Sequence, residues 1–147
     1  MNKFTTTHPT TGKTAKRGSE NRFYTHAVWA GKTEAQERAR LQADLERFIQ
    51  WRQECRDAAE GHGPRYEQDL ELAARFERHT ARTPEDWLKA AAEEQVRIER
   101  TQAELATQNG DVWWCDGWCG RPDLAEKKAA GLHKKGFMVA ISEAVQV

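Results

Sequence analysis

Residues 33–107 carry three successive helix patterns, and this run of helices restricts the possible folds more than any other feature of the sequence. The first pattern begins where Thr33 and Gln36 resemble a capping box and continues to about Glu60. Its apolar positions recur every three or four residues at Leu41, Leu45, Phe48, Cys55 and Ala59. At a rise of 1.5 Å per residue, such a helix is about 40 Å long.

Two clear breaks separate this helix from the next two. A glycine- and proline-rich turn at 61–64 precedes a second helix from Tyr66 to about Arg78. A strong start signal at 83–86, with threonine at the cap and proline at the first position, opens a third helix that runs to about Thr107. The expected inner line of the third helix is Leu88, Ala91, Gln95, Ile98, Gln102 and Leu105. We therefore expect the long first and third helices to form an antiparallel pair.

Three segments read as strands. Residues 22–30 and 111–115 are rich in aromatic and β-branched side chains, and 137–147 alternates apolar residues onto one face. A fourth helix is expected between the last two strands, from Pro122 to about Lys135. The order is strand, three helices, strand, helix, strand. It predicts an α+β fold with a small three-stranded sheet.

The domain organisation is expected to be simple, because 147 residues suit one domain. Residues 1–21 are polar and basic and are interpreted as a flexible arm, which leaves 22–147 as a single α+β domain. The N-terminus has no apolar signal region, and no apolar run approaches the ~20 residues of a membrane span. A cytoplasmic protein is expected, with 23 basic and 23 acidic residues in balance.

No catalytic or metal motif is complete. Residues 11–14 (TGKT) look like the end of a phosphate-binding loop, but Thr7 stands where that loop needs glycine. Cys115 and Cys119 leave open a zinc site or a Cys–His nucleophile, although their spacing is not that of a structural zinc pair. His79 is interpreted as a favourable charge near a helix C-terminus. We expect no enzyme activity, no cofactor and no resident metal.

The remaining interpretation is a binding function. Tryptophan and arginine dominate interface energetics, and the candidate contact residues for a protein partner are Trp118, Trp51, Trp87 and Arg52. Of the aromatic run at 113–118, strand alternation sends Trp113 and Trp114 to opposite faces, and Trp118 is expected to be exposed on a tight loop. The alternative is a nucleic-acid-binding accessory protein whose arm contacts phosphate through Lys13, Lys16, Arg17 and Arg22. The sequence does not indicate the oligomeric state.

Two stretches resemble small accessory proteins of bacteriophages and other mobile elements. The first comprises Arg17, Ser19 and residues 21–28 (NRFYTHAV), and the second is 121–125 (RPDLA) leading into the last helix and strand. The resemblance implies a bacterial or phage protein of the cell interior. Inhibitors of host defence, such as anti-CRISPR proteins, are frequent among proteins of this kind and act by occupying a partner's surface.

Overall fold

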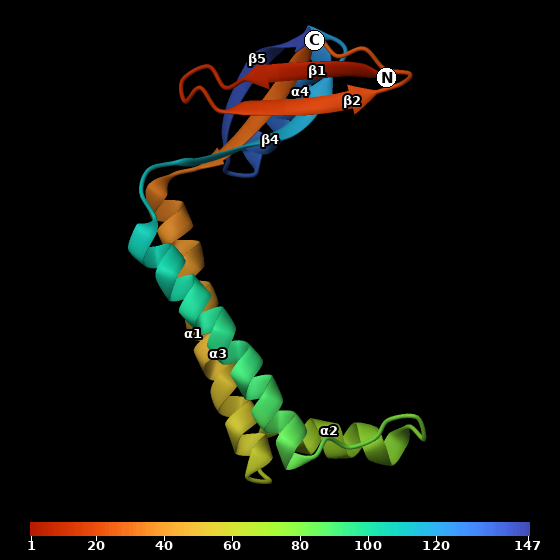
Figure 1. The fold of residues 1–147 in the computed structure, drawn as a ribbon, viewed down its shortest axis with the longest axis vertical. Coiled ribbons are helices and arrows are strands. Elements are labelled where there is room, and N and C mark those ends of the chain that lie inside the picture. Colours follow the sequence, from red (N-terminus) through yellow and green to blue (C-terminus); the bar gives the residue numbers. More distant parts are fainter. The chain divides into compact units, whose positions relative to one another are not determined.

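The computed structural model describes all of residues 1–147 and forms two compact units (Figure 1). The sheet unit comprises residues 1–37 and 109–147, and the helical unit comprises residues 38–108. The elements are, in chain order, β1 (Asn2–Thr7), β2 (Thr14–Ser19), β3 (His26–Lys32), α1 (Glu34–Ala59), α2 (Pro64–Arg75), α3 (Pro84–Thr107), β4 (Val112–Cys119), α4 (Pro122–Lys134) and β5 (Met138–Gln146). That residues 22–147 form a single domain stays a prediction.

The sheet has five strands and not three. Its strand order is β2-β1-β5-β3-β4, every neighbouring pair is antiparallel, and the sheet curves into a nearly closed barrel. The α+β class and the four helices are confirmed, but the three-stranded sheet is wrong. The two additional strands come from the segment that was expected to be a flexible arm.

That segment forms a hairpin because its first strand alternates strictly. Phe4, Thr6 and His8 are buried, while the residues between them stay more exposed. β1 pairs with β2 on one side and with β5 on the other, so that Phe4 lies opposite both Arg17 and Gln146. Three consecutive threonines with high β-propensity take the place of the apolar residues that usually mark a strand.

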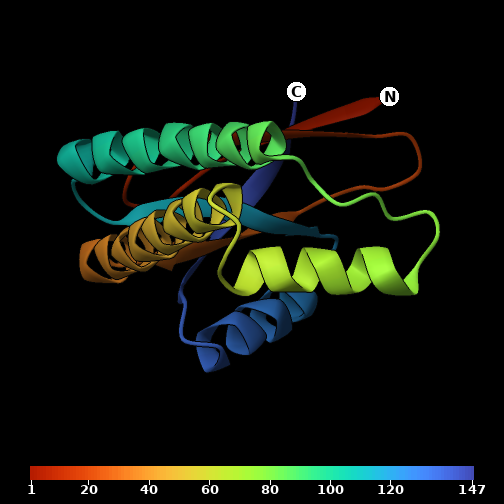
Figure 2. The same ribbon diagram turned by 90° about the horizontal axis from the view of Figure 1, so that it is seen from below.

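One face of the sheet packs against α4 (Figure 2). Val28 and Ala30 of β3 form a buried cluster with Ala125, Ala129 and Leu132, and Trp114 packs at its margin. α4 presents these three residues at a spacing of three and four, which places them on one side of the helix. This cluster is the main apolar core of the sheet unit.

The opposite face of the sheet buries aromatic rings. His8 lies edge-on to Trp29 at 5.3 Å and tilted against Trp113 at 4.3 Å, measured between ring centroids. Trp113 and Trp114 therefore lie on opposite faces of β4, as the alternation predicts. Nζ of Lys13 donates to the backbone oxygen of Trp113 at 2.5 Å and ties the β1–β2 hairpin to β4.

In the helical unit, α1 and α3 lie side by side and antiparallel, as the sequence predicts (Figure 1). The buried face of α3 is rotated from the expected one, because the ring of Trp87 turns inward and Leu88 does not. Leu88 is 56% exposed. The buried residues of α3 are Trp87, Ala91, Glu94, Ile98 and Thr101.

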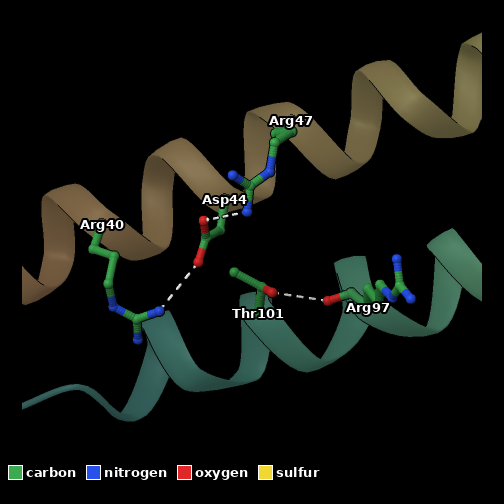
Figure 3. Close-up of polar contacts among 5 residues, drawn as sticks. All are labelled: Arg40, Asp44, Arg47, Arg97 and Thr101. Carbon is green, nitrogen blue, oxygen red and sulfur yellow. Dashed lines mark hydrogen bonds and ion pairs between the residues drawn. The ribbon is translucent and has the colours of Figure 1, made fainter.

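Figure 3 shows polar side chains of α1 and α3 that form contacts along their own helices. The carboxylate of Asp44 accepts from Arg40 at 3.1 Å and from Arg47 at 2.8 Å, and both pairs lie along α1. On α3, the hydroxyl of Thr101 donates to the backbone oxygen of Arg97 at 2.8 Å. None of the helices combines the length and the apolar composition that a bilayer crossing requires.

Candidate functional site

The segment that joins α2 to α3 carries the most organised group of polar side chains in the helical unit. α2 follows Gly63, whose φ of 94° is a left-handed conformation that favours glycine. α3 opens with a complete capping box, in which Thr83 and Asp86 exchange side-chain and backbone hydrogen bonds. Between the helices, the backbone N–H of His79 donates to the oxygen of Phe76 at 3.0 Å.

Asp69 anchors this connection from within α2. Its carboxylate is buried and accepts two hydrogen bonds of 2.8 Å, one from Nε2 of His79 and one from the backbone N–H of Arg82. Burial alone would raise the pKa of Asp69, but the bonds from Arg82 and His79 outweigh it and hold that pKa below its ordinary value. The carboxylate is therefore charged at neutral pH and holds the loop at His79 and Arg82.

An open pocket of about 210 Å³ lies beside this anchor. We call it the α2–α3 pocket. The polar and aromatic residues that line it are Arg65, Gln68, Asp69, His79, Arg82 and Trp87. All of them come from α2, α3 or the connection between them, so the pocket belongs entirely to the helical unit.

The two arginines of the α2–α3 pocket are held differently. Nε of Arg65 donates to Glu54 at 2.8 Å, and its guanidinium lies 5.5 Å from the ring centroid of Trp51. The Arg82 guanidinium lies 4.9 Å from the ring centroid of Trp87 and forms no ion pair. Stacking on the ring positions this cation and leaves its N–H donors available.

Trp87 forms the base of the pocket and not an exposed contact surface. It is 4% exposed and packs with Cys55, Ala58 and Ala91, so α1 and α3 meet at this point. Burial raises the pKa of the Cys55 thiol. The cluster is small, but it holds the indole that orients Arg82.

The other candidate contact residues lie in both units. Trp51 is half-buried, and its ring centroid lies 5.2 Å from the guanidinium of Arg47 and 5.5 Å from that of Arg65. Arg52 donates from Nη1 to the side-chain oxygen of Gln95 and so joins α1 to α3. Trp118 lies within β4 and not on a loop, and its half-buried ring tilts against Tyr24 at 5.9 Å.

The candidate phosphate contacts lie on or beside the β1–β2 hairpin. Lys16 and Arg17 line an open pocket of about 520 Å³ in the sheet unit, together with Lys3. The Arg17 guanidinium also lies 5.3 Å from the ring centroid of Tyr24. Lys13 reaches the backbone of Trp113 instead, and the backbone N–H of Arg22 donates to Ser19.

The register of β4 decides what its two cysteines can do. Cys115 pairs with Trp29 and Cys119 pairs with His26, and a bulge at Asp116 separates the two. Positions 26 and 29 of β3 point to opposite faces of the sheet, so the two thiols do as well. Cys119 packs beside the α4 cluster, and burial raises the pKa of the Cys115 thiol. One metal ion cannot bind both thiols.

One group of side chains has the chemistry of a metal site. The ligand atoms of Asp57, Glu60 and His62 lie within 4.8 Å of one another. Nε2 of His62 lies 3.2 Å from a carboxylate oxygen of Glu60, and the side chains of Glu60 and His62 are 74% and 60% exposed. An exposed carboxylate–imidazole pair accounts for this proximity without a metal, so we assign no site there.

Sequence reasoning missed the residues that organise the pocket. His79 and Arg82 follow Asp69 by 10 and 13 residues, and the three residues belong to no motif. The available signal was an aspartate within an amphipathic helix, followed by a short loop with two potential donors. No protein-family model, no curated protein and no solved structure matches this chain.

Proposed function

We propose that the chain is a non-enzymatic protein-binding module whose contact element is the helical unit. One observation carries this proposal: the α2–α3 pocket presents an arginine without an ion pair, stacked on a buried tryptophan. Arginine and tryptophan are the residue types that most often dominate binding energy, above all where a pocket holds them in place.

Exposed apolar side chains in the same segment support a partner surface. Leu70 and Leu88 are sequence neighbours of the lining residues Asp69 and Trp87, and Phe76 begins the connecting loop. Leu88 and Phe76 are each 56% exposed. A partner that covered them would add apolar burial to the polar contacts of the pocket.

The mode of action that we propose is occupation of a partner's surface. The likeness to phage and mobile-element accessory proteins suggests an inhibitor of a host defence complex, in the manner of anti-CRISPR proteins. Such an inhibitor needs a shaped contact surface and no bond chemistry.

The test is affinity capture with the tagged full-length chain and two matched variants. Leu88→Ser removes an exposed apolar side chain from the helical unit, and Leu124→Ser does so in the sheet unit, where Leu124 is 42% exposed. We expect the wild type and Leu124→Ser to recover one stoichiometric protein that Leu88→Ser loses. Recovery of nucleic acid alone, or of the same protein by all three, would overturn the proposal.

The second candidate function is nucleic-acid binding by the β1–β2 hairpin, favoured by the cations Lys3, Lys16 and Arg17 around one pocket. A fluorescent single-stranded oligonucleotide can be titrated at about 50 and 200 mM salt, because phosphate contacts give a steep salt dependence. Under this candidate function, affinity falls with salt and with Lys3→Ala and Lys16→Ala. Affinity that ignores both would exclude it.

A further inference from the structure

We infer that the α2–α3 pocket recognises an acidic side chain, a glutamate or aspartate of the partner protein. This inference rests on the proposed function and deepens it, because it names the chemistry that the partner must present. Three features of the pocket support it: its donors, its carboxylates and its size.

The lining side chains offer mainly hydrogen-bond donors. Arg65 and Arg82 supply guanidinium groups and Gln68 supplies an amide. Among them, Arg82 is exposed and forms no ion pair or side-chain hydrogen bond, although its charge lies near those of Asp69 and Asp86. A guanidinium fork fits a carboxylate in a bidentate arrangement, with two parallel N–H···O bonds.

The carboxylates around the pocket are already bound to other donors. Glu54 accepts from Arg65, and Asp69 accepts from His79 and from the backbone of Arg82. Asp86 accepts from the backbone N–H of Thr83 at 2.9 Å in the capping box. None of these carboxylates accepts a hydrogen bond from the Arg82 guanidinium. An incoming carboxylate could therefore accept hydrogen bonds from the N–H groups of that guanidinium.

The pocket is also prepared before any ligand arrives. Asp69 fixes the backbone of Arg82, and the Arg82 guanidinium lies over the ring of Trp87, 4.9 Å from its centroid. A cation that is held in place loses little side-chain entropy when it binds. This matters because the helical unit carries twelve Lys and Arg residues against fifteen Asp and Glu residues, so excess charge does not attract an anion there. Recognition of an anion must therefore come from directed hydrogen bonds in the pocket.

The volume suits one side chain. About 210 Å³ lies below the range of ordinary small-molecule sites and accommodates a single carboxylate with its methylene groups. The partner feature that we infer is therefore a single acidic side chain.

The test uses the full chain and two small probes that differ only in charge. N-acetyl-glutamate methylamide and its neutral glutamine analogue are titrated to millimolar concentration, and the side-chain N–H signals of Arg82 and Trp87 are followed by NMR. We expect saturable shifts with the glutamate probe only. Equal shifts with both probes, no saturable shift, or at least tenfold tighter binding of inorganic phosphate would each overturn the inference.

A variant pair links the pocket to the partner. Arg82→Gln keeps the length of the side chain and removes its charge, and Arg78→Gln does the same at an exposed position of the same loop. We expect Arg82→Gln to weaken probe and partner binding at least tenfold and Arg78→Gln to leave both unchanged. If the wild type captures a partner but the glutamate probe does not bind, this inference fails while the proposed function stands.

Discussion

Asp69→Asn tests the anchor of the α2–α3 pocket. The wild-type carboxylate accepts two hydrogen bonds of 2.8 Å, and bonds to a charged group contribute about 1.5–3 kcal/mol each. Asparagine has one acceptor oxygen, so one of the two donors loses its partner and the other loses the assistance of charge. A neutral amide is less costly to bury, which offsets part of the loss. We expect a net decrease of about 2 kcal/mol in the free energy of unfolding.

Urea unfolding followed by far-UV circular dichroism measures this decrease, because most of the helix lies in the helical unit. With a slope of about 1–3 kcal/mol/M, the midpoint should fall by about 1 M. Glu71→Gln is the matched control on α2. Its carboxylate forms only an exposed 3.5 Å pair with Arg75, so we expect a change within about 0.5 kcal/mol.

The pH dependence gives an independent check. The pKa of Asp69 is lower in the folded protein, so its stabilising contribution is complete above the ordinary aspartate pKa of about 3.9. The contribution is lost as the pH falls through the lower folded value. The difference between wild type and Asp69→Asn should therefore shrink below about pH 4. Equal stabilities at neutral pH, or a difference that persists in strong acid, would refute the reasoning.

Three further predictions concern other parts of the chain. Gly31→Ala places a Cβ 2.8 Å from the Trp113 ring and should lower the free energy of unfolding by about 1–3 kcal/mol. Gly131→Ala has open space on α4 and should raise the free energy of unfolding by up to about 1 kcal/mol. Thermal unfolding compares the two variants, and equal shifts of their midpoints would contradict the packing around Gly31. Thr83→Ala should lower the free energy of unfolding by about 1 kcal/mol through loss of the N-cap of α3, whereas Thr83→Ser keeps the cap. Equal urea midpoints for the two variants would argue against the capping box. The buried Cys55 thiol, with its raised pKa, should react with a disulfide reagent only after unfolding, and rapid reaction of all three thiols in the native protein would disprove its burial.

The helices and the C-terminal strand could be predicted because their signals are local. Thr83 and Pro84 mark the start of α3, and the alternation from 137 onward marks β5. The β1–β2 hairpin could not be recognised in the same way. β2 (TAKRGS) contains no large apolar residue, and its structure depends on pairing with β1. Pairing with a neighbouring strand therefore determines the structure of this segment, whose local sequence pattern does not indicate a strand.

The pocket was less predictable than the fold. Trp87 was expected to contact a partner, which stays a prediction. Its burial depends on the packing of α3 against α1, since either Trp87 or Leu88 could satisfy the helix pattern. His79 was interpreted through the helix terminus, whereas its structural role is to donate to Asp69. Such contacts arise from the path of a loop, which periodicity does not describe.

β3 and β4 are antiparallel neighbours whose pairing ends at Lys32 and Val112, and the backbone N–H of Glu34 donates to Asp111 at 3.0 Å just beyond. The helical unit is, in terms of connectivity, the loop of one hairpin. A short turn could close the same two strands at a smaller entropic cost, since that cost grows with loop length. Residues 38–108 can therefore be exchanged or shortened without removing any strand, since all five strands of the sheet lie outside them.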